Sequence, residues 1–182
     1  MQQAIGMLEF SSIARGIYTA DQMVKTSQVE VVTAVTTCPG KYIVIVTGDV
    51  SAVESSVEVG EKEAGEYIVD SIVIPNIIPS IFSAIVGATM PDTVEAIGIL
   101  ESFSMSAMII AADAVLKAAN VMPLELRLGN GIGGKAYFTF TGDIAAVQVG
   151  ADVGTKISGE KGLLVNVEVI PSPSDKIIPS LL

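Results

Sequence analysis

The feature that most constrains the fold of this chain is an internal repeat. Residues 4–29 recur as residues 96–121, with 11 of 26 positions identical. After a two-residue insertion, residues 40–66 recur as residues 134–160, with 12 of 27 positions identical. Self-similarity at a nearly fixed offset is the sequence signature of one structural unit used more than once.

Both halves also end in a similar phrase, VIPNIIP from Val73 and VIPSPSD from Val169. The repeat therefore covers almost the whole of each half. We expect two tandem domains of one fold, residues 1–88 and residues 93–182.

Hydrophobic patterns predict the same elements in each copy. β-branched runs predict strands, and apolar residues three or four positions apart predict helices. In the first copy we expect a strand at 4–10, a helix at 17–27, strands at 29–36 and 42–47, a helix from 50, and a strand at 67–74. Asp49 lies at the expected N-cap of the second helix, and Asp143 repeats it. The order β-α-β-β-α-β is the split βαβ pattern of ferredoxin-like α+β domains.

Composition excludes several classes of function. A formal net charge of -10 provides no basic surface for nucleic acid or for an anionic membrane. The chain has no His, so Ser/His/Asp triads, Cys/His pairs and His-ligated zinc cannot be built within it. We therefore expect no catalytic residues and no enzyme.

The remaining composition bears on location and assembly. The uncharged stretch at residues 71–91 is interrupted by Pro75, Pro79 and Pro91, so we expect no membrane span. A single Cys cannot close a disulfide within one chain, which fits the cytoplasm. Half of the residues are hydrophobic and 16% are charged, and such a surface favours an obligate oligomer.

The second half carries a resemblance to a known family. GILESFSMSAMIIAADAVLKAANV (residues 98–121), followed by GGKAYFTFTGDIAAV (residues 133–147), resembles the bacterial microcompartment shell domain. The first half carries the same pattern more loosely. Two such domains in one chain resemble the tandem-domain shell proteins, which form homotrimers that imitate the hexagonal tile of single-domain relatives. The resemblance implies a facet tile of a cytoplasmic microcompartment shell that meets other shell proteins.

The resemblance also implies a pore and tile edges. In this family the loop between the second and third strands lines the pore on the symmetry axis. The implied pore-lining residues are Thr37, Cys38, Pro39, Gly40, Asn130, Gly131, Ile132 and Gly133. Lys25 and Lys117 would lie at tile edges, whereas the plainer interpretation is a solvated helix face.

Cys38 is the candidate metal ligand. It lies beside a Pro-Gly pair in an expected turn, and three copies of a turn converge on the axis of a trimer. The TCPGKY stretch at residues 37–42 most resembles the tandem-domain shell proteins of propanediol-utilisation compartments. Those proteins are implicated in holding an iron–sulfur cluster at the pore. The resemblance implies a 4Fe–4S cluster on three Cys38 thiolates, one iron left open, and electron transfer across the shell to a redox partner.

Two other functions stay open. The protein could be a purely structural tile or a small-metabolite pore, in which Cys38 has no chemical role. A soluble ferredoxin-like enzyme would use Cys38 as a nucleophile, and the absence of His argues against it.

Two further patterns point away from catalysis. Residues 129–135 match both G-x-G-x-x-G and G-x-x-x-x-G-K, but a strand is expected after them where a nucleotide site needs a helix, and Ala136 replaces the Ser or Thr. Two interpretations of these residues remain, a flexible hairpin loop and the rim of a pore, and we favour the pore rim. Glu9 and Glu101 are repeat-equivalent, one per domain, which favours a structural role over acid–base catalysis.

Overall fold

The structure is a computed structural model that describes residues 3–89, 91–160 and 163–180. The chain divides into two compact units, Met1–Ile77 and Ile78–Leu182. The division falls before residue 88, the expected end of the first domain, because α3 (Ser80–Ile85) packs against β6 (Met122–Leu128) of the second unit. The expected domain ends at residues 1–2 and 181–182 lie outside the described residues.

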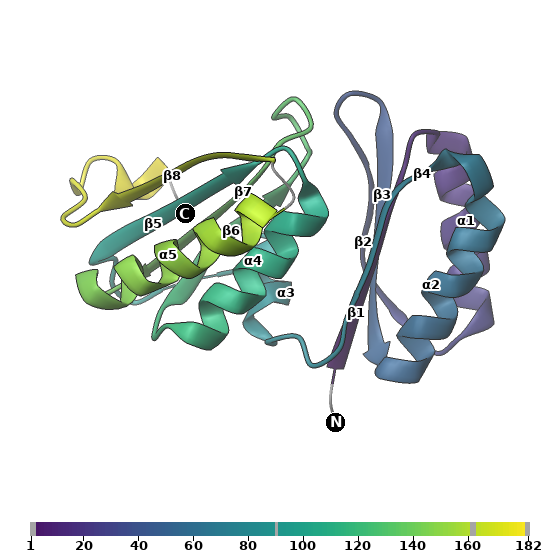
Figure 1. The fold of residues 1–182 in the computed structure, drawn as a ribbon, viewed down its shortest axis with the longest axis horizontal. Helices are drawn as coiled ribbons and strands as arrows, with labels where there is room; N and C mark the ends of the chain where they lie inside the picture. The colour runs from purple at the N-terminus through teal and green to yellow at the C-terminus, as the bar shows by residue number, and fades with distance from the viewer. Residues whose placement is uncertain (1–2, 90, 161–162, 181–182) are drawn as a thin grey trace. The chain divides into compact units, whose positions relative to one another are not determined.

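The first unit is a four-stranded antiparallel sheet with two helices on one face (Figure 1). Its elements are β1 (Gln3–Phe10), α1 (Ile13–Thr26), β2 (Glu30–Thr37), β3 (Lys41–Asp49), α2 (Val50–Ala64), a 3-10 turn (Gly65–Tyr67) and β4 (Ile68–Ile74). The strand order is β2-β3-β1-β4. The expected ferredoxin-like topology is therefore confirmed in this unit.

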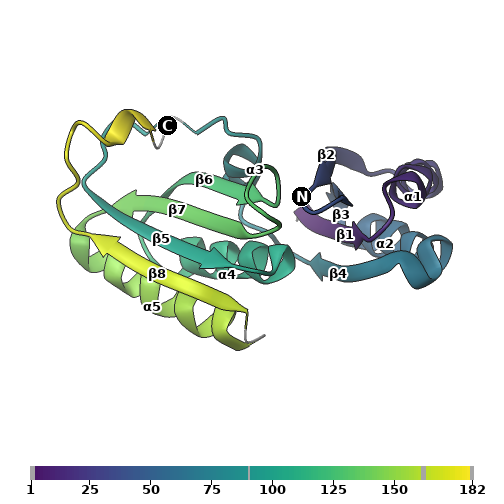
Figure 2. The same ribbon diagram turned by 90° about the horizontal axis from the view of Figure 1, so that it is seen from above.

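The second unit repeats this arrangement after α3 (Figure 2). Its elements are β5 (Ala96–Ser102), α4 (Met105–Ala118), β6 (Met122–Leu128), β7 (Ala136–Gly142), α5 (Ile144–Glu160), β8 (Leu164–Ile170) and a 3-10 turn (Ile178–Ser180). The strand order is β6-β7-β5-β8. The same order in both units confirms that the sequence repeat is a repeat of structure.

Helix caps explain two differences from the expected elements. α1 begins at Ile13, not at residue 17, because the Ser12 hydroxyl accepts the backbone N–H of Arg15 at 3.3 Å. Asp49 is the N-cap residue of α2, as expected, but its side chain makes no capping hydrogen bond. Asp143 does cap α5, with its carboxylate accepting the backbone N–H of Ala146 at 2.9 Å.

Helix and sheet approach each other closely at the same point in both units. A Cβ added to Gly60 of α2 would lie 2.3 Å from Leu8 Cδ1 of β1. A Cβ added to the equivalent Gly154 of α5 would lie 2.2 Å from Leu100 Cδ1 of β5. Such distances are shorter than carbon atoms tolerate, so glycine sets the packing of the second helix on the sheet in each copy.

None of the helices in the described parts of the chain is long and apolar enough to cross a membrane.

Candidate functional site

The hairpin turn of the first unit carries the one thiol of the chain. β2 ends at Thr37 and β3 begins at Lys41, and the N–H of Gly40 donates to the carbonyl oxygen of Thr37 at 3.0 Å. The Cys38–Pro39 peptide bond is cis. Pro39 and Gly40 are exposed, and Cys38 is half-buried with a free thiol. The expected turn at residues 37–40 is therefore present, and the cysteine within it is half-buried.

The residue before the thiol has a buried hydroxyl. Thr37 is 5% exposed, and its hydroxyl has no hydrogen-bond partner among the described residues, a property that it shares with Thr19 and Ser158. The hydroxyls of the buried Thr47 and Thr141, in contrast, donate to the carbonyl oxygens of Ala4 and Ala96. An unpaired buried hydroxyl costs free energy, and of these three residues Thr37 is the one next to the thiol.

An ion pair lies beside each hairpin turn. Lys41 Nζ is 2.6 Å from Glu9 Oε1, and the repeat-equivalent Lys135 Nζ is 2.7 Å from Glu101 Oε1. The Glu9 side chain is 6% exposed and that of Glu101 is 33% exposed. Each pair joins the first strand of its copy to the strand after the turn, which fits the structural role expected for Glu9 and Glu101.

The hairpin turn of the second unit contains the two-residue insertion. The first turn has three residues between its strand-end partners, Thr37 and Lys41, and the second has five, between Gly129 and Lys135. Four glycines here adopt positive φ angles: Gly129, Gly131, Gly133 and Gly134. Asn130, Gly131 and Gly133 are exposed and Ile132 is half-buried. Because β7 follows this loop, it opens no helix, and the nucleotide-binding motifs are excluded as expected.

The two candidate edge lysines are held by their own helices. Lys25 is paired with Asp21 at 2.6 Å and Lys117 with Asp113 at 2.5 Å, each one turn away. Both lysine side chains are exposed. Asp113 is buried, and its second oxygen accepts the backbone N–H of Ile78 at 2.9 Å.

A polar cluster on the second sheet has no counterpart in the first. The Tyr137 hydroxyl donates to a carboxylate oxygen of Glu125, and Arg127 Nη2 lies 2.7 Å from the other oxygen. Burial, and then the hydrogen bond to Glu125, raise the pKa of Tyr137 to about 12. The positions equivalent to Arg127 and Tyr137 are Val35 and Ile43. Sequence reasoning missed this cluster, because its residues are separated by the hairpin turn and follow no recognised spacing.

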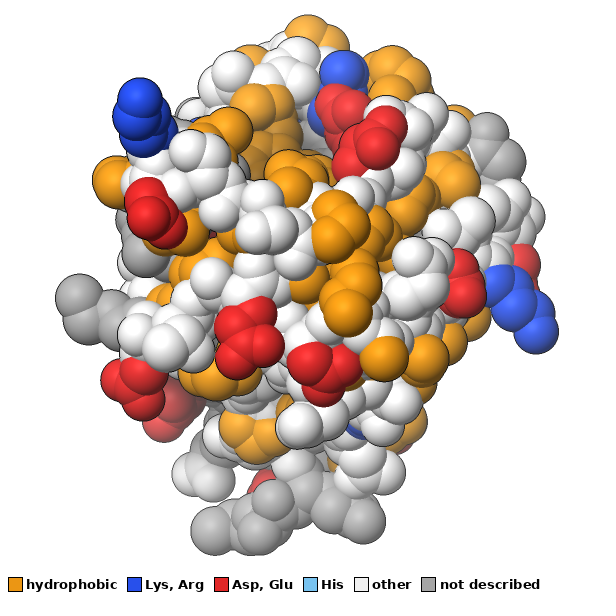
Figure 3. All heavy atoms as spheres, turned by 90° about the vertical axis from the view of Figure 1, so that its left-hand side faces the viewer, with side chains coloured by type: hydrophobic (Ala, Val, Ile, Leu, Met, Phe, Trp, Pro, Cys, Tyr) orange, Lys and Arg blue, Asp and Glu red, His pale blue; other side chains and the backbone are white. Residues whose placement is uncertain are grey.

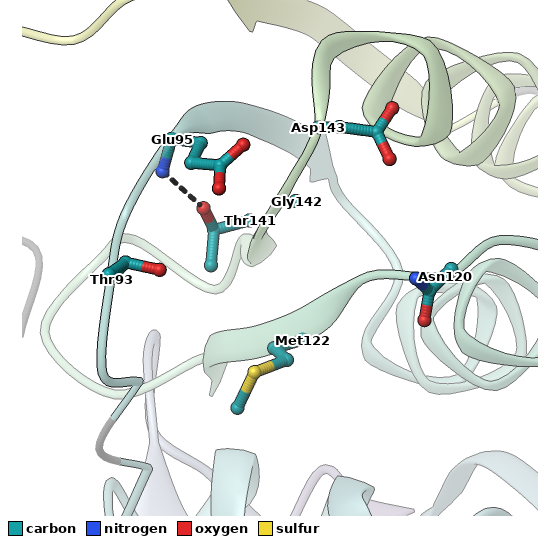
Figure 4. Close-up of a pocket in the computed structure, with 7 residues that line it drawn as sticks. All are labelled: Thr93, Glu95, Asn120, Met122, Thr141, Gly142 and Asp143. Atoms are coloured by element: carbon teal, nitrogen blue, oxygen red, sulfur yellow. Dashed lines mark hydrogen bonds between the residues drawn. The ribbon is translucent and has the colours of Figure 1, made fainter.

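A surface pocket of about 280 Å³ lies in the second unit (Figure 4). It is lined by Thr93, Glu95, Asn120, Met122, Thr141, Gly142 and Asp143. The backbone N–H of Glu95 donates to the Thr141 hydroxyl at 3.2 Å, while the carboxylates of Glu95 and Asp143 point in different directions. No sequence motif indicates this pocket, and its polar groups do not converge on one point.

The capacity to hold a metal is limited within one chain. The described residues contain no group of three or more His, Cys, Asp or Glu side chains placed to hold a metal ion. Cys38 can therefore contribute one thiolate ligand, and any further ligands must come from other molecules.

The helix after the first strand differs sharply in burial between the copies. Ile17 of α1 is 54% exposed, whereas the equivalent Ile109 of α4 is 0% exposed. Ile13 and Val24 are likewise exposed, and their counterparts Met105 and Leu116 are buried. A different side, the one on the left of Figure 1 where β8 is drawn, is shown in Figure 3, and there hydrophobic side chains form patches between Asp and Glu side chains. Several large apolar side chains exposed on one helix are typical of surfaces that meet another protein.

Comparison with known proteins gives consistent results. A model of the BMC domain matches residues 4–77 and 96–173. The chain is 42% identical over 177 residues to the bacterial microcompartment shell protein PduT of Citrobacter freundii, covering 97% of this chain and 96% of that protein. It is 36% identical over 89 residues to the shell protein PduA of Salmonella typhimurium, covering 47% of this chain and 92% of PduA. The crystal structure of a microcompartment protein from Desulfitobacterium hafniense superposes with a TM-score of 0.94 at 44% identity, covering 98% of this chain and 99% of that one.

Proposed function

The chain belongs to the BMC domain family, with two copies of the domain in tandem, and we propose that it is a facet tile of a bacterial microcompartment shell. In this proposal three chains form a homotrimer whose six domains imitate a hexagonal tile. Similarity to PduT over nearly the full length of both chains supports the tile role. The match of half of this chain to almost all of PduA supports the view that one domain here stands for one subunit of a single-domain shell protein.

The observation that carries the trimer is the uneven burial of α1 and α4. The two helices occupy equivalent places in equivalent domains, yet Ile17 is exposed and Ile109 is buried. An apolar helix face that is exposed in one copy, while the equivalent face is buried in the other, is typical of a surface that meets another protein chain. Head-to-tail contacts between identical chains either close into a ring or extend into a filament, and a ring of three chains with two domains each gives the sixfold pseudosymmetry of a tile.

Oligomeric state tests this directly. Sedimentation equilibrium of the wild-type chain is expected to give three times the chain mass of 18.8 kDa. Ile17→Asp places a charge in the proposed interface and is expected to give monomers. Val149→Asp is the matched control, because Val149 lies on α5, is 48% exposed, and has the exposed counterpart Ser55. A monomeric wild-type chain at micromolar concentration contradicts the tile.

We also propose that the Cys38 turns of the trimer together hold an iron–sulfur cluster at the pore. The ligands that the chain offers fit such a cluster only through symmetry. One chain offers one free thiol, on a half-buried cysteine in a hairpin turn, so three thiolates require three chains around the threefold axis. The hydroxyl of Thr37 beside the thiol is buried and unpaired among the described residues, and a neighbouring chain at the pore would supply a partner for it. When bound, such a cluster supplies one-electron redox chemistry.

The residues of this chain have distinct parts in the proposal. Cys38 binds as a thiolate, and the Thr37 to Gly40 hydrogen bond fixes the turn that presents it. The ion pair of Lys41 with the buried Glu9 anchors the strand after the turn to the centre of the sheet. Asn130, Gly131, Ile132 and Gly133 of the second turn would alternate with the Cys38 turns around the pore, and Lys25 and Lys117 would face neighbouring tiles.

Electron paramagnetic resonance of anaerobically purified trimer, before and after dithionite, tests the cluster. We expect about four irons and four sulfides per trimer and a redox-active signal. Cys38→Ser is expected to remove the iron and the signal while leaving the trimer intact. A colourless trimer that takes up no iron after anaerobic reconstitution would leave a structural tile or a small-metabolite pore.

A further inference from the structure

The segments that follow the last strand of each copy form the same turn. Ile78 and Ser174 are equivalent positions in the phrases VIPNIIP and VIPSPSD. The N–H of Ile81 donates to the carbonyl oxygen of Ile78 at 3.1 Å, and the N–H of Ile177 donates to that of Ser174 at 2.9 Å. The backbone thus repeats although the sequences have diverged.

The first of these turns is docked and the second is exposed. The N–H of Ile78 donates to Asp113 Oδ1 on α4 at 2.9 Å, and the side chain of Ile81 is 0% exposed where α3 packs on β6. The side chain of Ile177, equivalent to Ile81, is 46% exposed. The segment after β8 therefore has the same backbone turn as the segment docked on α4, but its isoleucine side chain is not buried.

The surface matching the docked one exists on the first unit. Asp21 of α1 is the counterpart of Asp113, and its Oδ2 holds Lys25 as Asp113 Oδ2 holds Lys117. The hydrogen bonds that Asp21 makes within the described residues use Oδ2, which leaves Oδ1 available. Asp21 is exposed where Asp113 is buried.

The edge strand next to α1 is also uncovered. Val31 of β2 is exposed and Val32 and Ala34 are half-buried, whereas their counterparts in β6, Pro123, Leu124 and Leu126, are buried. An exposed, apolar edge strand is an aggregation hazard that proteins normally cover. In the second unit α3, which continues the docked turn, packs against the edge strand.

We propose that the segment after β8 of one copy, residues 171–179, docks on α1 and β2 of a second copy of this chain. In this contact the N–H of Ser174 donates to Asp21 Oδ1, and Ile177 covers the apolar surface of α1 and β2. The occupant is a second copy because the chain itself contains the docked counterpart of this contact, in the turn from Ile78 to Ile81 on Asp113. The proposal rests on the homotrimer proposed above, and it assigns the segment that joins one chain to the next.

Cross-linking between differently labelled chains tests the contact. In a Cys38→Ser background, which leaves no other thiol, one chain carries Ile17→Cys and another carries Ile177→Cys. The two are unfolded, mixed, refolded together and treated with a short bismaleimide. We expect covalent heterodimers of the two chains. A mixture of Val149→Cys with Ile177→Cys is the control and is expected to give none. Equal yields in the two mixtures would overturn the proposal.

A second measurement isolates the hydrogen bond. Ser174→Pro removes the donating N–H, and Ser174→Ala keeps it while removing the hydroxyl. We expect Ser174→Pro and Asp21→Ala to raise the dissociation constant of the trimer at least about tenfold, with Ser174→Ala close to wild type. A trimer indifferent to Ser174→Pro overturns the docking and leaves the tile intact, whereas a monomeric wild-type chain overturns the tile itself. Heterodimers formed only with an added single-domain shell protein would also overturn docking on a second copy.

Discussion

The two copies of the domain share a fold and differ around the hairpin turn. The first turn is short and carries Cys38, while the second is two residues longer and rich in glycine. Val35 and Ile43 make the sheet beside the first turn apolar, whereas Arg127 and Tyr137 make the equivalent surface polar. Because both copies lie in one chain, their surface residues can differ while the packing of helices on the sheet stays the same. In a ring of identical single-domain subunits, every subunit has the same surface.

The largest loss of stability is expected from changes in the cores of the two sheets. Phe140 of β7 is fully buried and its ring stacks on Phe138 with centroids 5.2 Å apart, and its counterpart Val46 is also fully buried. Phe140→Ala is expected to cost about 4 kcal/mol in the second unit, and Val46→Ala about 2 kcal/mol in the first. Urea unfolding followed by far-ultraviolet circular dichroism measures both losses. Equal losses would mean that the larger ring adds nothing to the second core.

The next largest effect is expected from the ion pairs beside the two hairpin turns, which differ in burial. Lys41→Met leaves the carboxylate of Glu9 buried without its cation, and we expect a loss of about 3 kcal/mol. Lys135→Met leaves the more exposed Glu101, and we expect a loss below about 1 kcal/mol. Urea unfolding at low and high salt separates the two. Glu9→Gln combined with Lys41→Met is the control and should recover most of the stability, which a simple packing defect would not.

The polar cluster of the second copy predicts a difference at alkaline pH. Burial and the bond to Glu125 raise the pKa of Tyr137 to about 12, above the ordinary value near 10. The folded state therefore keeps the proton between these values while the unfolded state loses it, so stability falls as the pH rises from about 10 to about 12. At neutral pH, Tyr137→Phe removes one hydrogen bond to a carboxylate, a loss of about 1.5 kcal/mol.

Absorbance titration of the phenols checks this assignment. Wild type should show one tyrosine that ionises near pH 12, and Tyr137→Phe should lack it and lose less stability in that range. A wild-type titration in which all phenols ionise near pH 10 would contradict the cluster. Tyr18→Phe serves as the control, since Tyr18 is exposed on α1.

The repeat allowed the fold to be predicted, because two copies of one pattern constrain each other's strands and turns. The hairpin turn with Cys38 was predictable from Pro39 and Gly40, whose backbone preferences act locally. The cluster of Glu125, Arg127 and Tyr137 was not, because it depends on the register between β6 and β7. The uneven burial of α1 and α4 was equally beyond prediction, since hydrophobic periodicity shows which face is apolar and not what covers it.

The smallest expected effect comes from the helix caps, where sequence and structure disagreed. Asp49 and Asp143 occupy the same position before α2 and α5, but the side chain of Asp143 alone accepts a backbone N–H, that of Ala146. Asp143→Ala should therefore cost about 1 kcal/mol, and Asp49→Ala a few tenths. Asp→Asn at each position is the control, because asparagine caps nearly as well as aspartate. If Asp49→Ala costs as much as Asp143→Ala in urea unfolding, the caps act through charge at the helix N-terminus, which both carboxylates share. In that case Asp→Asn will be costly at both positions, and the two copies differ in geometry but not in how their helices are stabilised.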